Sequence, residues 1–534
     1  MTTVHSPLVS PLRAAGYAVL PTPRETRLTG ETVRVHADWR LAHRAVDADD
    51  IAVRTLQSRL EEEHGFRLTG PANVNSPTVE LAIDPQSVET DTDDDRQTQA
   101  YTLDIGPNRI VATGVGPAGL FYAVQTLLHL FDSGQGRLPQ GRIRDWPRLA
   151  WRCIHWDTKH HQDTLETLRR YLDQAARYKI NAVLFELEDK FAYPSHPVIG
   201  APGAFTPADG ARNAGRLSAA RDTFFDPALT DEAPMGAIAA AWDDAGLHNE
   251  SFWLGWAHMA QHAWTPTAVS VEETTATFMD IHYGRGTAES MAAAYRTLHN
   301  AARLYEQTLE KLPSKVRGPA YGHPLWKGPM PRCDTGMMPP AEPRLPNDTA
   351  VSMPPVFGKR YAEAVARAPA AQDDCERLIE QLHGLLGRAQ RNRYAIEVLI
   401  SLTTHLRHFF RIVADVAKAE DSLRQAALAG KQGEHRQARR ALIRARDTVR
   451  DTLRDGQAVF EGLRAVWERS QRPRNAPADG KFFVHVMDDV KDHFADRRAD
   501  LTYLIAPEET LNLGDWLTQI DETIQRYDAA TNRE

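Results

Sequence analysis

Residues 151–189 constrain the fold most, because they read as a strand, a helix and a second strand in succession. The helical stretch, residues 164–178, carries apolar side chains at helical spacing, among them Leu165, Leu168 and Leu172. Charged residues stand where both strands end. Parallel strands joined by a helix bring their carboxyl ends to one edge of a sheet, and α/β folds bind ligands at that edge. The segment therefore predicts a ligand site beside the strand ends.

Composition narrows the class of ligand. With 42% hydrophobic and 25% charged residues, the 534-residue chain can bury several cores. A formal net charge of -8 disfavours nucleic acid and anionic membranes as partners, since both reward basic surfaces. A neutral or weakly charged ligand fits this balance better.

The lack of targeting signals and the spacing of the cysteines indicate an ordinary globular protein. No apolar run approaches the roughly 20 residues of a membrane span, and the first residues lack the pattern of a secretion signal. We therefore expect a cytoplasmic protein. Cys153, Cys333 and Cys375 are widely spaced and match no disulfide framework or thiolate zinc site. We expect reduced thiols, no bound metal and no other cofactor.

The N-terminal part, residues 18–145, predicts a small α/β domain. Strand patterns lie at residues 32–36 and 78–84, and a helical pattern lies at residues 49–63. Residues 101–114 predict a hairpin, because two alternating runs flank Gly106-Pro107-Asn108. An amphipathic helix is expected to follow the hairpin.

The remainder of the chain is predicted to hold a third strand and a long helical part. Residues 236–242 read as the strand, and residues 313–357 read as a proline-rich connector. Residues 358–534 are predicted to be helical, with one long helix running to Gly430 and a second over residues 434–469. We expect these two long helices to run antiparallel and to form a hairpin or a bundle.

Several motifs in this order resemble a known family. A small α/β domain, GLFYAVQTLLHL, IRDWPRLAWRCIHWD and LDQAARYKINAVLFELEDKFAY together resemble the start of glycoside hydrolase family 20. These are the β-N-acetylhexosaminidases, and the hexosaminidase D-like branch is the most similar. The stretch GAIAAAWDDAGLHNESFWLGWAHMAQHAWTP resembles the last strand and helix of the family's barrel. The resemblance covers residues 21–284 and implies a (β/α)8 TIM barrel after the small domain.

The resemblance also implies a ligand, an N-acetylhexosaminide, and residues that contact it. In such proteins an Arg on the first strand binds sugar hydroxyls, a Trp on the last strand walls the pocket, and acidic residues near strand ends bind further hydroxyls. The substrate-binding candidates are Arg152, His161, Glu188, Asp189, Trp242, Asp243 and Glu250. The alternative for the acids ending the second strand is an ion pair with Arg152 or Lys190.

The sequence departs from the family where the reaction takes place. The family's chemistry is substrate-assisted: an Asp orients the 2-acetamido group, and the adjacent Glu protonates the leaving oxygen. A complete barrel takes roughly 250 residues, whereas residues 146–312 show strands resembling only the first, second and eighth. The Asp-Glu pair before the last strand is Asp231-Glu232, and it lacks a strand pattern. Both residues are weak catalytic candidates, and a loop or helix start is the other interpretation.

Three functions remain open from the sequence. The chain is a family 20 protein with impaired activity, or a hydrolase whose shortened barrel is completed by other segments or by a second copy. The third is a non-catalytic carbohydrate-binding or scaffolding protein. The predicted fold class is α/β with a partial TIM-barrel-like domain and a helical C-terminal domain, and a homo-oligomer is possible.

Overall fold

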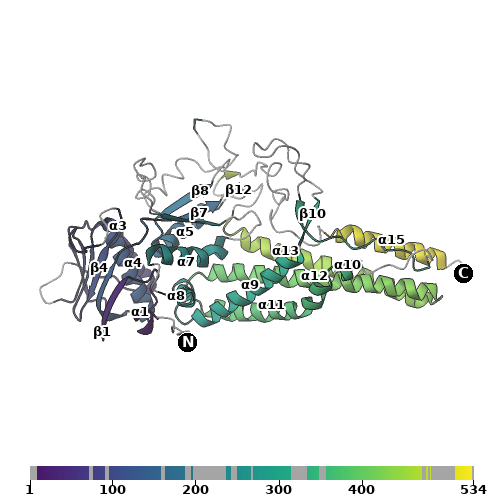
Figure 1. Cartoon of the computed structure of the whole chain (residues 1–534), viewed down its shortest axis with the longest axis horizontal. Helices are drawn as coiled ribbons and strands as arrows, with labels where there is room; N and C mark the ends of the chain where they lie inside the picture. Colours follow the sequence, from purple (N-terminus) through teal and green to yellow (C-terminus); the bar gives the residue numbers. More distant parts are fainter. Residues whose placement is uncertain are drawn as a thin grey trace, which may run out of the picture. The chain divides into compact units, whose positions relative to one another are not determined.

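The computed structural model describes most of the chain (Figure 1). The described residues are 9–70, 76–90, 95–157, 163–186, 194–195, 236–241, 249–265, 269–313, 333–347, 356–471, 477–478, 481–482 and 511–531. The chain divides into two compact units. The first comprises Met1–Trp242, Asn249–Ala292 and Arg388–Arg393, and the second Asp243–His248, Ala293–Gly387 and Tyr394–Glu534. The predicted border at residue 145 falls inside the first unit.

The first unit begins with a six-stranded mixed sheet, in the order β1-β6-β4-β5-β3-β2. Its strands are β1 (Glu25–Arg34), β2 (Arg40–Arg44), β3 (Thr78–Ile83), β4 (Tyr101–Ile105), β5 (Arg109–Gly114) and β6 (Arg137–Asp145). The predicted hairpin is confirmed, since β4 pairs antiparallel with β5. The sequence patterns missed β2 and β6, because RLAHR and RLPQGRIRD lack the alternation of apolar and polar residues.

Two helices cover one face of this sheet, α2 (Ile51–His64) and α4 (Pro117–Gly134). The Asp50 side chain caps α2 by accepting a hydrogen bond from the Ala52 amide at 2.8 Å. The α4 helix lies against the strands because it carries Gly119. A Cβ there would lie 2.1 Å from the Ala100 carbonyl oxygen, so a larger residue would push the helix away. The buried side chains between helices and sheet form one continuous core.

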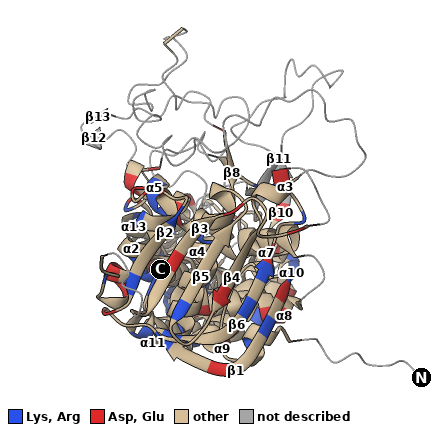
Figure 2. Cartoon of the chain, turned by 90° about the vertical axis from the view of Figure 1, so that its left-hand side faces the viewer, with Lys and Arg blue, Asp and Glu red and all other residues tan. Residues whose placement is uncertain are grey.

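The other face of the sheet carries acidic and basic residues side by side (Figure 2). Glu80 pairs with Arg44 at 3.2 Å and with Arg109 at 2.5 Å, and Arg142 pairs with Asp104 at 3.4 Å. The arginines are more than half exposed. Each exposed pair contributes about 0 to 1 kcal/mol, so the face is solvated rather than a source of stability.

A second sheet in the first unit is parallel and three-stranded, in the order β8-β7-β9. Its strands are β7 (Trp151–Asp157), β8 (Ala182–Glu186) and β9 (Gly236–Ala241), which confirms the strands predicted in this region. Helix α5 (Leu165–Arg177) joins β7 to β8, and Thr164 caps it by accepting from the Thr167 amide. The 3-10 turn η2 (Asn249–Phe252) leads into α7 (Trp253–Trp264), and α8 (Val271–Tyr283) follows.

A buried ionic network fastens the two sheets together. Lys179, which follows α5, has a fully buried side chain, and its Nζ donates to the Tyr101 hydroxyl at 2.8 Å and to Asp145 Oδ2 at 3.1 Å. Trp264 at the end of α7 donates its Nε1 to Asp145 Oδ1 at 2.8 Å. Tyr101 and Asp145 belong to the first sheet, so the carboxylate ties β4 and β6 to the second.

The second unit is helical. It contains most or all of the long helices α9 (Ala288–Thr308), α11 (Ala362–Arg388), α12 (Arg393–Lys431), α13 (His435–Trp467) and α15 (Leu513–Thr531). The shorter described elements of the chain are α1 (Pro11–Ala14), α3 (Asp95–Thr98), α10 (Val356–Arg360), β10 (Glu310–Pro313), β11 (Cys333–Gly336), β12 (Pro477–Ala478) and β13 (Lys481–Phe482). The structure thus confirms a mixed α/β protein with a helical C-terminal part. Among the helices that the structure describes, none combines the length and apolar character needed to cross a membrane.

The predicted antiparallel packing of α12 and α13 is confirmed. Arg411 pairs with Asp455 at 2.5 Å, and the Thr452 hydroxyl donates to Asp415 Oδ2 at 2.9 Å. The prediction of one helix running to Gly430 is wrong. The helix is interrupted between α11 and α12, where Asn392 adopts a φ of 48°. Asn tolerates this left-handed conformation better than most residues.

Replacing Lys179 tests the ionic network. Burial lowers the pKa of Lys179 to about 8, although Asp145 favours the charged ammonium. Lys179→Met leaves the buried Asp145 carboxylate without its cation, so we expect a loss of about 3–5 kcal/mol in the free energy of unfolding at pH 7. Asp145→Asn combined with Lys179→Met should cost less than the sum of the single changes.

The pH dependence of the free energy of unfolding provides a second test of the role of Lys179. Between about pH 8 and pH 10 the unfolded chain binds more protons than the folded chain at Lys179, so wild-type stability should rise with pH. In urea unfolding, the free energy of unfolding of the wild type should show this rise. The contribution of Lys179 to the rise should be missing in Lys179→Met. The exposed Lys359→Met serves as control. An unchanged free energy of unfolding in Lys179→Met would contradict the network.

Candidate functional site

The carboxyl ends of the three-stranded parallel sheet form the edge that the sequence predicted as a ligand site. Strand β7 ends at Asp157 and β8 at Glu186, and these two residues face each other in the register. Strand β9 runs parallel to β7 on its other side and ends at Ala241. Because all three strands point the same way, whatever follows them in the sequence leaves from this edge.

One face of the sheet carries an imidazole–carboxylate pair close to this edge. His155 on β7 and Glu186 on β8 lie with Nε2 and Oε2 2.9 Å apart. The His155 side chain is 8% exposed and the Glu186 side chain 27% exposed. The imidazole is therefore nearly enclosed, while the carboxylate reaches the surface.

The opposite face packs against the helices through aromatic residues. Trp156 is buried, donates its Nε1 to Asp163 Oδ2 at 3.0 Å, and lies 4.7 Å from the Tyr171 ring of α5 and 6.3 Å from the Trp256 ring of α7. Trp253 and Trp256 are themselves buried. These rings make up the core between sheet and helices, and they offer no exposed stacking surface in this structure.

Arg152 lies on this opposite face, near the start of β7, and its side chain is fully buried. All its nitrogens donate to protein atoms at 2.7–3.1 Å. The acceptors are the carbonyls of Leu149, Ala150 and Lys179, the Gln99 side chain and the Tyr122 hydroxyl. In this arrangement the guanidinium joins the parallel sheet to Gln99 before β4 and to Tyr122 on α4. Contact with a sugar stays a prediction and would require these bonds to be replaced.

The expected ion pair between the acids of β8 and Arg152 is wrong for Glu186. Arg152 and His155 are three residues apart on a strand, so their side chains point to opposite faces of the sheet. Glu186 shares the face of His155 and pairs with it instead.

Glu250 is buried in η2 and forms an ion pair with Arg170 of α5. The Arg170 guanidinium also lies over the Tyr171 ring, 4.6 Å from its centre. This position makes Glu250 a link between η2 and α5, and its role toward a sugar stays a prediction. The candidates His161, Glu188, Asp189, Asp231, Glu232, Trp242 and Asp243 lie outside the described residues.

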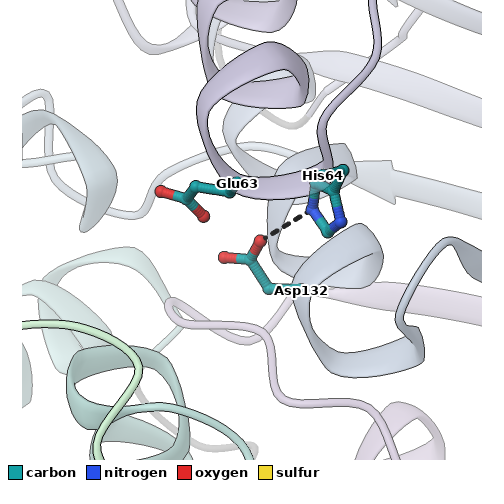
Figure 3. Close-up of side chains that lie close together, drawn as sticks. All are labelled: Glu63, His64 and Asp132. Carbon is teal, nitrogen blue, oxygen red and sulfur yellow. Dashed lines mark hydrogen bonds and ion pairs between the residues drawn. The ribbon is translucent and has the colours of Figure 1, made fainter.

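A second group of titratable residues, which no sequence pattern indicated, lies in the first unit (Figure 3). Glu63, His64 and Asp132 hold their ligand-type atoms within 4.8 Å of one another, and His64 Nε2 lies 3.2 Å from Asp132 Oδ1. Their partners are far apart in sequence, so no local motif marks the group. Among the described residues, this is the group that a metal ion could be expected to occupy.

Arginines already neutralise this group. Arg391 lies 3.1 Å from Asp132 and Arg177 lies 3.0 Å from Glu63, and Arg59 pairs with Glu63 at 2.5 Å. A cation would meet three guanidinium groups there. The residues therefore do not fit a metal, and the group is a structural ion-pair network.

The network sets the ionisation of Asp132. Burial alone would raise the pKa of Asp132, but the hydrogen bond with His64 and the guanidiniums of Arg391, Arg177 and Arg59 together hold that pKa far below its usual range. Burial, with a further contribution from Arg59, lowers the pKa of Arg177 to about 10. The carboxylate thus stays ionised in the folded chain down to strongly acid pH.

Comparison with known proteins identifies the N-terminal part. Residues 16–146 match the family model described as glycosyl hydrolase family 20, domain 2. This range covers the six-stranded sheet with α2 and α4. It overlaps residues 18–145, for which a small α/β hexosaminidase-type domain is expected.

Curated proteins also match part of the chain. The chain is 33% identical over 171 residues to a β-hexosaminidase of Vibrio vulnificus, which is 32% of this chain and 18% of that protein. It is 36% identical over 91 residues to the N,N'-diacetylchitobiase of Vibrio harveyi, which is 17% of this chain and 10% of that protein. The chain thus spans a minor part of the length of these relatives.

Solved structures add a weaker likeness. A family 20 exo-β-N-acetylglucosaminidase of Vibrio harveyi in complex with N-acetylglucosamine aligns with a TM-score of 0.33 and 19% identity. The alignment covers 41% of this chain and 36% of that one. The sequence matches, not this alignment, carry the relationship to β-N-acetylhexosaminidases.

Removing the Asp132 charge tests the ion-pair network. Because the pKa of folded Asp132 is depressed, its stabilisation is present above about pH 4, the usual range of Asp, and is lost as pH falls below it. We expect Asp132→Asn to lower the free energy of unfolding by about 3 kcal/mol at pH 7 and to flatten its decline between pH 5 and pH 2.

The half-exposed Asp104, paired with Arg142, provides the matched control. Asp104→Asn should change stability by less than about 1 kcal/mol and leave the acid profile intact. Equal effects of both variants in urea unfolding would argue against the network.

Proposed function

We propose that this chain, a glycoside hydrolase family 20 protein, binds terminal N-acetylhexosaminides at the carboxyl ends of β7 and β8 and hydrolyses them slowly or not at all. One observation carries the proposal. The family's domain 2 ends at residue 146, and a parallel β-α-β unit with polar strand ends begins at Trp151. The buried Lys179–Asp145 pair fixes this unit on the domain.

The ligand follows from the relatives and from the charge of the chain. The similar curated proteins are named β-hexosaminidases and a diacetylchitobiase. A neutral acetamido sugar suits a chain whose net charge is -8, because it requires no basic surface. In the sequence, Glu188 and Asp189 follow β8 closely, and Trp242 and Asp243 follow β9 directly.

The catalytic part of the proposal rests on the sequence between β8 and β9. Substrate-assisted hydrolysis needs an Asp to orient the acetamido group and an adjacent Glu to protonate the leaving oxygen. Asp231-Glu232 is the pair of that order in this interval, without the pattern of a strand before it. We therefore infer a partial TIM-barrel-like domain that retains the first, second and last strands and lacks the strand bearing the family's acid.

Binding and turnover measured on the same preparation test this proposal. Calorimetric titration of the full chain with N-acetylglucosamine should show saturable binding. Hydrolysis of a chromogenic N-acetylglucosaminide should stay far below the 1–1,000 per second that is typical of enzymes. Any residual rate should be the same in Asp231→Asn and Glu232→Gln.

The hydrolysis and the sugar binding in this proposal would be contradicted by different results. Turnover in the usual enzymatic range that Glu232→Gln abolishes would show an active hydrolase with its acid at Glu232. Absence of heat and of any spectroscopic change at high millimolar N-acetylglucosamine would contradict sugar binding.

A further inference from the structure

We infer that His258 and His262 of α7 together bind one divalent metal ion of the class that prefers imidazole ligands, namely Ni²⁺, Cu²⁺ or Zn²⁺. The inference does not depend on the proposed sugar binding, because both histidines lie on a helix and not at a strand end. The sequence predicts no bound metal, because its cysteines match no thiolate site. The ligands of this site are imidazoles, on which the spacing of the cysteines gives no information.

The two histidines occupy adjacent turns on one side of α7. They stand four residues apart in a helix of 12 residues, so their side chains lie one above the other. Their ring centres lie 6.2 Å apart, and the ring planes are inclined by 27° to each other. Two histidines four residues apart on one helix face are the pair that zinc-binding helices present to the ion.

The core of the unit holds the opposite side of α7. Trp253, Trp256 and Trp264 of this helix are buried. His258 is half-buried and His262 is exposed. At 3.6 residues per turn, the two histidines lie on the side of the helix that faces away from these rings. The helix is therefore fixed through its apolar side, while the imidazole pair is open to an ion that arrives from solvent.

Thr275 of α8 holds the ring of His258. The Nε2 of His258 lies 3.0 Å from the Thr275 Oγ1. When Nε2 carries the ring proton and donates it to this hydroxyl, Nδ1 keeps the lone pair that a metal ion takes. Metal-binding histidines usually donate their second ring N–H in this manner, and the bond fixes the tautomer and the ring orientation. Thr275 is therefore the positioning residue of the site.

The chemistry of the ligands selects the class of ion. Imidazole nitrogens suit Ni²⁺, Cu²⁺ and Zn²⁺, whereas Mg²⁺ and Ca²⁺ require oxygen ligands. Two imidazoles leave the remaining positions of the ion to water, as in open zinc sites. In the described part of the chain, neither ring forms an ion pair with an acid that the metal would have to break.

Calorimetric titration of the full chain with Ni²⁺, without an affinity tag, tests the site. The strongest binding event of the wild type should be weakened at least about tenfold in His262→Gln, since loss of a ligand costs no less than loss of a residue that supports one. His299→Gln is the matched control, because His299 is exposed on the helix α9 and should not contribute. Equal affinities of the two variants would overturn the assignment, and so would a wild type that does not bind Ni²⁺. Neither result would affect the proposed sugar binding.

A metal at this position stabilises the helix that carries Trp264, which donates its Nε1 to Asp145. The unfolded chain does not hold the two imidazoles in one orientation, so Ni²⁺ binds the folded state preferentially and stabilises it. Ni²⁺ should raise the urea midpoint of the wild type and of His299→Gln, but not that of His262→Gln. The same rise in all three chains would place the metal elsewhere and refute the site.

The role of Thr275 needs a readout that loss of packing would not imitate. Thr275→Val keeps the size of the side chain but removes the acceptor for His258, so Ni²⁺ should bind about tenfold more weakly. Thr275→Ser restores the hydroxyl and should recover most of the affinity. Equal weakening in both variants would show that Thr275 packs against the ring without positioning it.

A measurement on the unmodified chain covers the case in which a variant does not fold. Diethyl pyrocarbonate modifies accessible imidazole nitrogens, and peptide mass spectrometry reports the extent of modification at each histidine. Saturating Ni²⁺ should protect His262 and leave the modification of His299 unchanged. Modification of His262 to the same extent with and without Ni²⁺ would contradict the site.

Discussion

A single buried carboxylate, Asp145, is the constraint on which the first unit depends. It receives hydrogen bonds from Tyr101, Lys179 and Trp264, and from the Arg24 backbone amide at 3.0 Å. These donors come from the N-terminal sheet, from the loop after α5 and from the end of α7. A buried charge is tolerated only when it is well paired, so the sheets must meet in one orientation to satisfy it.

The two ends of β7 have different roles. Near the start of β7, Arg152 is buried, and the hydrogen bonds that its guanidinium donates hold the parallel sheet to the domain that precedes it. At its other end, five residues or about 17 Å further along at the usual rise, the strand reaches Asp157 and the neighbouring Glu186. Anchoring and the proposed ligand contact are thereby separated along one strand.

The sequence predicted what local patterns encode. The hairpin at Gly106, the helices and the three parallel strands emerged from periodicity and turn residues. It did not predict β6, whose side chains lack alternation, or the break at Asn392, where helical periodicity continues on both sides. The pairing of His155 with Glu186 was also missed, because strand register, which periodicity leaves open, decides which polar residues meet across a sheet.

Native-state hydrogen exchange tests the central claim most directly, namely that the N-terminal six-stranded domain and the parallel sheet behave as one body fixed by Asp145. Amides of β4, β6 and β7 are expected to exchange with the same free energy of opening in low concentrations of urea, and Asp145→Asn should lower that value in all three strands together. Exchange of β7 through a separate opening of lower free energy, while β4 and β6 stay protected, would contradict the account.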